Sequence, residues 1–219
     1  MSDVVKRYNH DVENGVRARA SRARQQTILQ AALHLFLEKG FGTTTLDQIL
    51  ERSGASVGSF YHHFQSKVDV AAALYLETLE AYQATFLNEL RRHPEARAGI
   101  EGAVRHHLRW TGRNPELATY LTHCREPEVA EASETRAQEL NRAFFEQTGA
   151  WLLAQVRDGK VRRLSSQLYQ ALWMGPSLEY TRLWLLGSQP HNVRQLAEAE
   201  ELLAKTAWEN LKVRERRER

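Results

Sequence analysis

The chain has very little sulfur and no long apolar run. Its 219 residues include one cysteine, Cys124, so no internal disulfide can form and no cysteine pair is available for zinc. No window approaches the roughly 20 apolar residues of a membrane span, and the charged first twenty residues are unlike a signal peptide. These absences favour a protein of the reducing cytoplasm that has no membrane partner.

Catalytic and phosphate-binding motifs are also missing. The sequence contains no HExxH and no glycine-rich phosphate loop, which argues against an enzyme. The nine histidines invite a metal or hydrolase site, above all His106 and His107 with His123 and Cys124. Adjacent helical residues point about 100° apart, so such a site would need two helices to converge. We therefore expect no metal, no cofactor and no catalytic residue.

The charge of the chain is unevenly distributed. Residues 1–67 carry nine basic and six acidic side chains, whereas the remainder carries 21 of each, so the whole net charge of +3 lies in the first third. An excess of this size is mild, and by itself it is equally consistent with a solvated surface. It becomes informative only beside a motif.

The first third of the chain predicts three helices. Residues 22–39 place apolar side chains on one helical stripe, and Gly40 follows where a helix end favours a left-handed residue. A second helix at 46–52 begins with a capping box formed by Thr45 and Gln48. The sequence SGAS then forms a turn, and a third short helix covers 57–64. Helix, glycine-containing turn and short helix have the spacing of a helix-turn-helix, whose second helix enters the major groove of DNA.

The pattern from Lys67 onward is that of longer helices interrupted at proline and glycine. No strand-like alternation is present, so we expect an all-α protein with an N-terminal three-helix helix-turn-helix domain followed by a larger helical bundle. The expected divisions are a flexible basic arm at 1–20, the helix-turn-helix domain at 21–67, the bundle at 68–213 and a charged tail at 214–219. The expected long helices cover 67–92, 97–112, 116–123, 129–157, 166–187 and 192–213.

The rings of the stretch GASVGSFYHHF divide between two faces of the third helix. At 100° per residue, Phe64 lies about 40° and Val57 about 60° from Phe60, so the wheel places these three inward. Tyr61 and the histidines beside it are left to offer hydroxyl and imidazole groups to phosphates or base edges. Helical packing with solvated imidazoles is the alternative, because helix-turn-helix geometry also occurs without DNA binding.

The run ILQAALHLFLEKGFGTTTLDQILERSGASVGSFYHHFQSK, residues 28–67, resembles the DNA-binding region of the TetR family of bacterial transcriptional regulators. The match includes the paired threonines that open the second helix, SG at the turn, and YHHF followed by lysine. The resemblance implies that phosphates are met by Thr44 and Thr45, that the groove is faced by Ser56, Val57, Gly58 and Ser59, and that Tyr61, His62 and Lys67 hold backbone or base edges.

The larger part of the chain is rich in aromatic residues, and core packing alone could account for them. They could also line a pocket for a small apolar or aromatic effector. The expected ligand-binding residues are Tyr82, Phe86, Trp110, Tyr120, Phe144 and Trp173. The resemblance further implies a dimer face on the last two long helices, carrying Leu178, Leu183, Trp184 and Leu186 on one and Leu196, Leu203, Ala207 and Leu211 on the other.

The resulting expectation is a homodimeric, ligand-responsive transcriptional repressor that binds a palindromic double-stranded operator and is released by the effector. The alternative is a helical effector-binding or protein-interaction module without sequence-specific DNA binding. Sequence-selective binding to DNA distinguishes the two.

Overall fold

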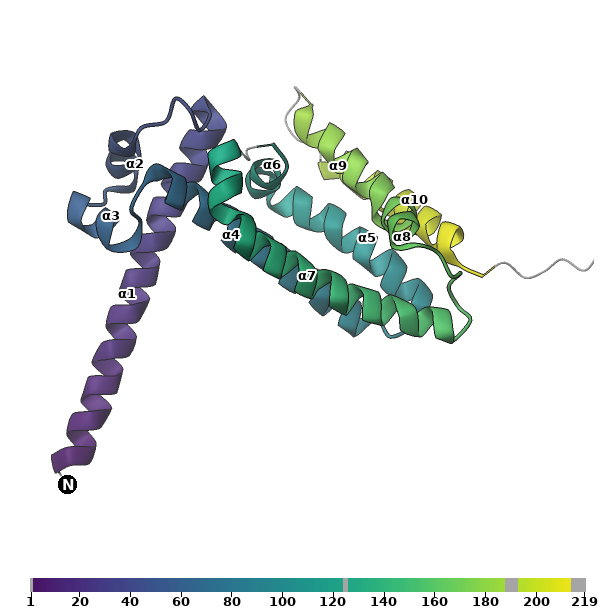
Figure 1. The fold of residues 1–219 in the computed structure, drawn as a ribbon, viewed down its shortest axis with the longest axis horizontal. Coiled ribbons are helices and arrows are strands. Elements are labelled where there is room, and N and C mark those ends of the chain that lie inside the picture. Colours follow the sequence, from purple (N-terminus) through teal and green to yellow (C-terminus); the bar gives the residue numbers. More distant parts are fainter. Residues whose placement is uncertain (1, 124–125, 188–192, 214–219) are drawn as a thin grey trace, which may run out of the picture. The chain divides into compact units, whose positions relative to one another are not determined.

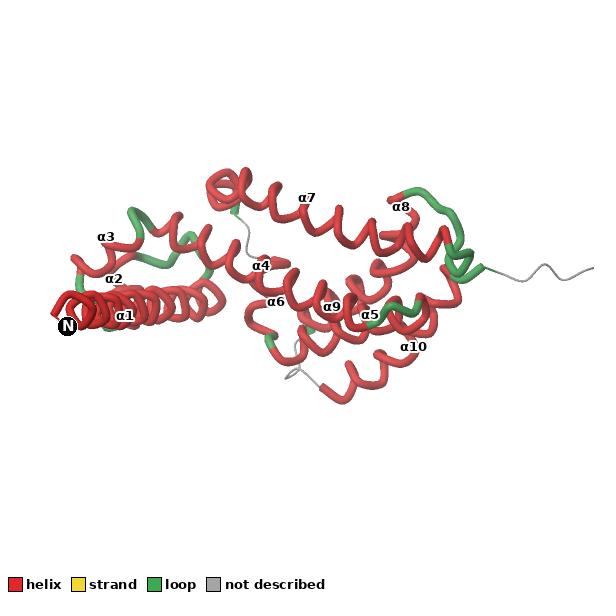
Figure 2. Tube along the Cα trace, turned by 90° about the horizontal axis from the view of Figure 1, so that it is seen from below, coloured by secondary structure: helices red, strands yellow, loops and turns green. Residues whose placement is uncertain are grey.

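The computed structural model describes residues 2–123, 126–187 and 193–213, and these residues form an all-α fold (Figure 2). Strand pairing in this part of the chain is limited to one isolated bridge between Val161 and Lys212. The all-α prediction is confirmed. The chain divides into two compact units, described separately below: unit 1 is Met1–Tyr75 with Cys124–Ser133, and unit 2 is Leu76–His123 with Glu134–Arg219. Cys124 and the predicted tail at 214–219 lie outside the described residues.

Unit 1 contains the three predicted N-terminal helices: α1 (Ser2–Lys39), α2 (Leu46–Ser53) and α3 (Val57–His63), followed by the first turns of α4 (Lys67–Arg92) (Figure 1). Gly40 and Gly54 follow the ends of α1 and α2 with φ of 83° and 66°, a backbone conformation that glycine adopts without steric cost. The capping box of Thr45 and Gln48 is present at the start of α2. The local signals in the sequence therefore fix the ends of α1 and α2 and the start of α2.

Two predicted boundaries of unit 1 are wrong. The expected flexible arm at 1–20 is part of α1, which begins at Ser2; the segment has no proline, the residue that most strongly breaks a helix. The expected domain limit at Lys67 lies within a packed region, because Val70 and Ala71 on α4 are completely buried in unit 1. The unit ends instead at Tyr75, part-way along α4.

The core of unit 1 is built where the three helices meet. Ile28 and Ala32 on α1, Ile49 on α2 and Phe60 on α3 each have no exposed surface. Burying a side chain of this size stabilises the fold by about 1.5–3 kcal/mol. Because α2 and α3 are eight and seven residues long, too short to be stable alone, these contacts hold the helix-turn-helix in place.

Unit 2 is a helical bundle around α5 (Ala96–Arg113), with α10 (Val193–Leu211) lying along it (Figure 1). Ile100 and Ala103 of α5 are fully buried, as are Ala204 and Leu211 of α10. The other elements are α6 (Pro115–His123), α7 (Pro127–Arg157, whose first turns belong to unit 1), α8 (Ser166–Tyr169), a π-helical turn η1 (Gln170–Met174) and α9 (Gly175–Leu186).

The apolar residues expected at a dimer face separate into two groups. Leu183 and Leu186 on α9 are each 55% exposed, and the structure adds Leu202 on α10 at 68%. Leu178 on α9 is also exposed, at 42%, whereas Trp184 of α9 and the named residues of α10, the helix that packs on α5, are buried or half-buried in unit 2 itself. This correction applies to Trp184, Leu196, Leu203, Ala207 and Leu211.

Candidate functional site

The exposed surface of α3 carries most of the predicted DNA-contacting residues. Ser56 caps the helix by accepting a hydrogen bond from the backbone N–H of Ser59 at 3.2 Å, and Tyr61 and His62 face outward, with Tyr61 55% exposed. No atom lies within 4 Å of the position that a Cβ of Gly58 would occupy, so its backbone is open to approach. This surface therefore offers hydroxyl, imidazole and backbone groups to a ligand outside the domain.

Val57 does not lie on the inward face where the helical wheel places it. Its side chain is 58% exposed, whereas Phe60 and Phe64 are buried as predicted, at 0% and 5%. Val57 is the first residue of α3, at the end of a two-turn helix, and angular position alone does not bring an end residue under neighbouring helices. The exposure agrees with the groove-facing position that the family resemblance implies.

The two threonines at the start of α2 have different roles. Thr45 is exposed, and its hydroxyl accepts from the N–H of Gln48 at 3.3 Å. Thr44 is 1% exposed, and its hydroxyl donates to the carbonyl oxygens of Gly40 at 2.8 Å and Leu35 at 3.3 Å. The expected phosphate contact of the Thr44 side chain is therefore wrong, because that hydroxyl is used to close the end of α1.

Lys67 is also directed into unit 1 instead of outward. Its ammonium group donates to the carbonyl oxygens of Phe41 at 2.7 Å and Thr44 at 2.8 Å. The same nitrogen lies 4.2 Å from the centre of the Phe41 ring, a cation–π contact. The expected contact with DNA is thus replaced by a contact that ties the start of α4 to the loop between α1 and α2.

Replacing Lys67 by methionine should lower the free energy of unfolding by about 2 kcal/mol, because two carbonyl groups lose a charged donor. Lys39→Met removes an exposed lysine and is the matched control, for which a change within about 0.5 kcal/mol is expected. Urea unfolding followed by circular dichroism measures both. Equal stability of the two variants would mean that Lys67 does not hold the loop.

One basic side chain of α1, Arg24, lies close enough to α3 to act on its His63. The guanidinium groups of Arg17, Arg19, Arg22 and Arg24 all belong to exposed residues. Burial lowers the pKa of His63, and the positive charges of His62 and Arg24 lower it further. The influence of Arg24 on His63 shows that α1 adds positive charge beside the exposed surface of α3, where phosphate groups would be attracted.

Unit 2 contains a cavity of about 520 Å³ with mainly apolar walls. Tyr82 and Phe86 of α4, Phe144 of α7 and Trp173 of η1 line it, so four of the six predicted ligand-binding residues lie at one site. Their rings contact one another: Phe86 lies 5.2 Å from Phe144 and 6.4 Å from Trp173, measured between ring centres. A cavity of this size suits a drug-sized molecule.

The other two predicted ligand-binding residues are outside the cavity wall. Tyr120 is 1% exposed and belongs to the packed interior. Trp110 packs against the Tyr82 ring at 4.9 Å but does not border the cavity. Both residues are aromatic in the sequence, but the sequence does not show whether each ring faces the cavity or the packed interior.

The prediction missed several residues of the cavity wall. Phe145, Thr148, Gly149 and Leu152 form a continuous strip on α7, and their spacing of three to four residues could have identified it. Tyr169 of α8 is also in the wall. Gly99 shapes the neighbouring region, because a Cβ there would lie 2.2 Å from Cζ2 of Trp151, whose ring stacks on Trp173 at 5.9 Å.

A buried polar chain joins the cavity wall to the core. The Tyr82 hydroxyl lies 2.9 Å from Nδ1 of His107, and Nε2 of His107 lies 2.9 Å from Oγ1 of Thr181. Burial lowers the pKa of His107 to about 4, and the charge of the neighbouring His106 acts in the same direction. The chain links α4, α5 and α9, and sequence reasoning treated these residues only as metal or pocket candidates, or not at all.

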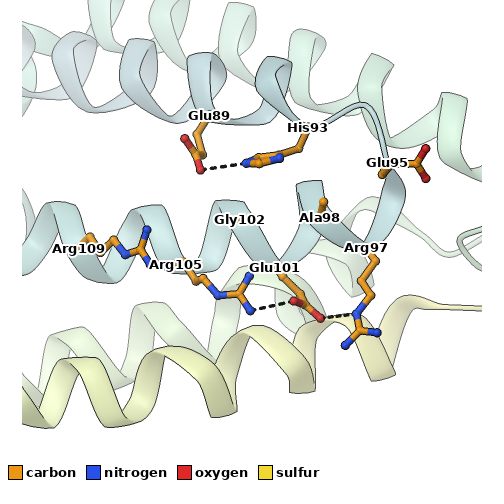
Figure 3. Close-up of a pocket in the computed structure, with 9 residues that line it drawn as sticks. All are labelled: Glu89, His93, Glu95, Arg97, Ala98, Glu101, Gly102, Arg105 and Arg109. Atoms are coloured by element: carbon orange, nitrogen blue, oxygen red, sulfur yellow. Dashed lines mark hydrogen bonds and ion pairs between the residues drawn. The ribbon is translucent and has the colours of Figure 1, made fainter.

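A second, charged groove of about 510 Å³ is lined by α5, the end of α4 and the connection between them (Figure 3). Its arginines are already paired with glutamates: Arg97 with Glu101 at 2.7 Å, Arg105 with Glu101 at 2.8 Å and Glu201 at 3.0 Å, and Arg109 with Glu200 at 2.5 Å. Burial acts to raise the pKa of Glu101, but hydrogen bonds from Arg97 and Arg105 outweigh it and hold this pKa below its usual range. Arg105 and Arg109 join α5 to α10 through Glu201 and Glu200, whereas Arg97 pairs within α5, so each of these cations already has a carboxylate partner.

Within the described ranges, no group of three or more histidine, cysteine, aspartate or glutamate side chains has the geometry of a metal site. None of the described helices is both long enough and apolar enough to span a membrane.

Comparison with known proteins places the first part of the chain in a family. Residues 28–74 match the family model described as "Bacterial regulatory proteins, tetR family", which confirms the predicted resemblance for this segment. The HTH-type transcriptional regulator YerO of Bacillus subtilis is 36% identical over 76 residues, which cover 35% of this chain and 25% of that protein. The transcriptional regulator AcuR of Cereibacter sphaeroides is 36% identical over 64 residues, 29% of each chain. The chain thus spans less than a third of the length of these curated relatives.

Solved structures extend the likeness of the fold to both units. A TetR family transcription regulator from Marinobacter aquaeolei VT8 has a TM-score of 0.65 at 20% identity, covering 90% of this chain and 100% of that one. The regulator FadR from Bacillus subtilis, solved in complex with stearoyl-CoA, has a TM-score of 0.67 at 17% identity, covering 83% and 98%. At these identities the comparison establishes the fold.

Proposed function

We propose that the protein is a ligand-responsive transcriptional repressor that binds a palindromic operator as a homodimer and releases it when a small molecule binds in unit 2. The observation that carries the proposal is the exposed surface of α3, which presents Ser56, Tyr61 and His62 while Phe60 and Phe64 anchor the helix from within. Family membership of residues 28–74 supports the same reading. Action on chromosomal DNA would place the protein in the cytoplasm.

The effector part of the proposal is supported by the apolar cavity. Two of its lining residues, Tyr82 and Phe86, lie on α4, the helix whose first turns belong to unit 1 and whose remainder belongs to unit 2. A ligand that prefers one position of α4 would shift the population between DNA-competent and incompetent forms. The exposed leucines of α9 and α10, Leu183, Leu186 and Leu202, support a surface for a second copy of the chain.

The proposal is tested by titrating fluorescent genomic duplexes that contain inverted repeats with the protein, at several salt concentrations. Binding should select one fragment, and its affinity should fall steeply as salt rises, because phosphate contacts release counterions. A protein that binds no fragment at low salt would instead be the alternative, a helical effector-binding or interaction module. The His62→Ala variant should reduce affinity for the selected fragment more than for random duplex.

A further inference from the structure

The cavity wall shows which kind of molecule unit 2 accepts. Among the described residues that line the cavity, none is aspartate, glutamate, lysine, arginine or histidine. The arginines of the charged groove along α5 are already paired with glutamates. An ionised group placed in the cavity would lose its hydration without gaining a counter-ion, which costs several kcal/mol. A ligand of this cavity therefore carries no charge inside it.

The polar chain that begins at Tyr82 has a defined direction. Oγ1 of Thr181 donates within its own helix, at 3.0 Å from the carbonyl oxygens of both Ser177 and Leu178. Its single hydrogen is thus engaged, and Nε2 of His107 donates to the Thr181 oxygen. A neutral imidazole has one donor and one acceptor nitrogen, so Nδ1 of His107 accepts the hydrogen of the Tyr82 hydroxyl.

The charge states agree with this direction. Burial lowers the pKa of His107 to about 4 and raises that of Tyr82, so both groups are neutral at pH 7. The Tyr82 oxygen, having donated its hydrogen to His107, keeps acceptor capacity. Tyr82 is the residue of the cavity wall that belongs to this chain. The other tyrosine of the wall, Tyr169, already accepts from the Leu164 N–H at 3.1 Å and donates to the Arg162 carbonyl at 2.6 Å.

We propose that the effector is an uncharged, largely apolar molecule with a hydroxyl or N–H group, which donates a hydrogen bond to the Tyr82 oxygen at the end of the His107–Thr181 chain. The inference rests on the proposed effector role of the cavity. Such an effector differs from an acyl-CoA thioester. The phosphates of coenzyme A do not fit the uncharged wall, and the acyl chain has no donor for the Tyr82 oxygen.

The test uses three naphthalene probes of one shape in isothermal titration calorimetry with the full chain: 2-naphthol, which donates; 2-methoxynaphthalene, which only accepts; and 2-naphthoate, which is an anion. We expect 2-naphthol to bind about tenfold more tightly than either of the others, the ratio that one net hydrogen bond provides. In Tyr82→Phe this advantage over 2-methoxynaphthalene should disappear while the affinity for 2-methoxynaphthalene stays the same, which also shows that the variant keeps its cavity.

Thr148→Val is the matched control, because the Thr148 hydroxyl lies in the wall but already donates to the Phe144 carbonyl at 2.9 Å. It should retain the preference for 2-naphthol. Equal binding of 2-naphthol and 2-methoxynaphthalene, a preference that survives in Tyr82→Phe, or tightest binding of 2-naphthoate would overturn the inference. Failure of every probe to bind would overturn the effector cavity as well, whereas the DNA titration tests the other part of the proposed function independently.

Discussion

Replacing Phe64 by alanine should lower the free energy of unfolding by about 3–5 kcal/mol, the cost of removing a buried aromatic ring. Phe64 is 5% exposed, its ring lies 5.8 Å from that of Phe60, and its backbone N–H closes α3 by donating to the Phe60 carbonyl at 2.9 Å. A loss of this size is a large fraction of the stability of a small domain. Thermal and urea unfolding measure it, and Phe64→Leu, which leaves a smaller cavity, should lose less.

Tyr61→Ala is the matched comparison on the other face of the same helix. Tyr61 is 55% exposed, so its removal should change stability by no more than about 0.5 kcal/mol. The affinity of the Tyr61→Ala variant for the operator should nevertheless fall about tenfold or more, because a contact to DNA is lost. If Phe64→Ala unfolds like the wild type and Tyr61→Ala is the unstable variant, the two faces of α3 have been assigned the wrong way round.

Features of the fold that depend on near neighbours in sequence could be predicted. The capping box joins Thr45 to a residue three positions away, and Gly40 and Gly54 mark helix ends through their own backbone preference. The bounds predicted for the long helices are likewise within a few residues of those observed, since apolar spacing and proline positions determine them. All of these signals depend only on residues that lie close to one another in the sequence.

Features that depend on contacts between distant segments could not be predicted. The Lys67 ammonium group donates to carbonyl oxygens 23 and 26 residues earlier. In the sequence alone, a lysine that follows a short helix is equally compatible with a contact to DNA. His107 and Thr181 are separated by 74 residues, and only the packing of α9 against α5 brings them together. The sequence showed which side chains could make such contacts, but the direction in which each points is a property of tertiary packing.

This difference also explains why the two proposed sites were predicted unequally well. The surface of α3 lies within eight consecutive residues of a short helix, so the 100° step separates Phe60 and Phe64 from Tyr61 and His62 without further information. The cavity is assembled from α4, α7, α8, η1 and α9. Trp173 was predicted from its aromatic character alone, whereas Gln170 and Met174, which lie beside it in the π-helical turn η1 and also line the cavity, were not.

The stability of unit 2 should fall by about 3 kcal/mol between pH 6.5 and pH 4, through His107 alone. Burial holds the pKa of this imidazole at about 4 in the folded protein, whereas an unfolded chain has a value near 6.5. Between these two values the unfolded state binds the proton and the folded state does not, so protonation favours unfolding. The loss begins as the pH falls below about 6.5 and is complete near pH 4.

The measurement is urea unfolding at a series of pH values for the wild type and His107→Gln, with His123→Gln, an exposed histidine, as control. Carboxylates with lowered pKa values, such as Glu101 and Glu201, also lose stabilising charge in acid, but both variants retain them. The difference in free energy of unfolding between wild type and His107→Gln therefore isolates the contribution of His107. Between pH 6.5 and pH 4 this difference should change by about 3 kcal/mol, so that the variant gains stability relative to the wild type at low pH. A constant difference would mean that the imidazole is hydrated or already charged in the folded protein. In the charged form both ring nitrogens are donors, so Nδ1 would no longer accept from Tyr82, and the phenol oxygen would lose the orientation on which recognition of a hydroxyl-bearing effector depends.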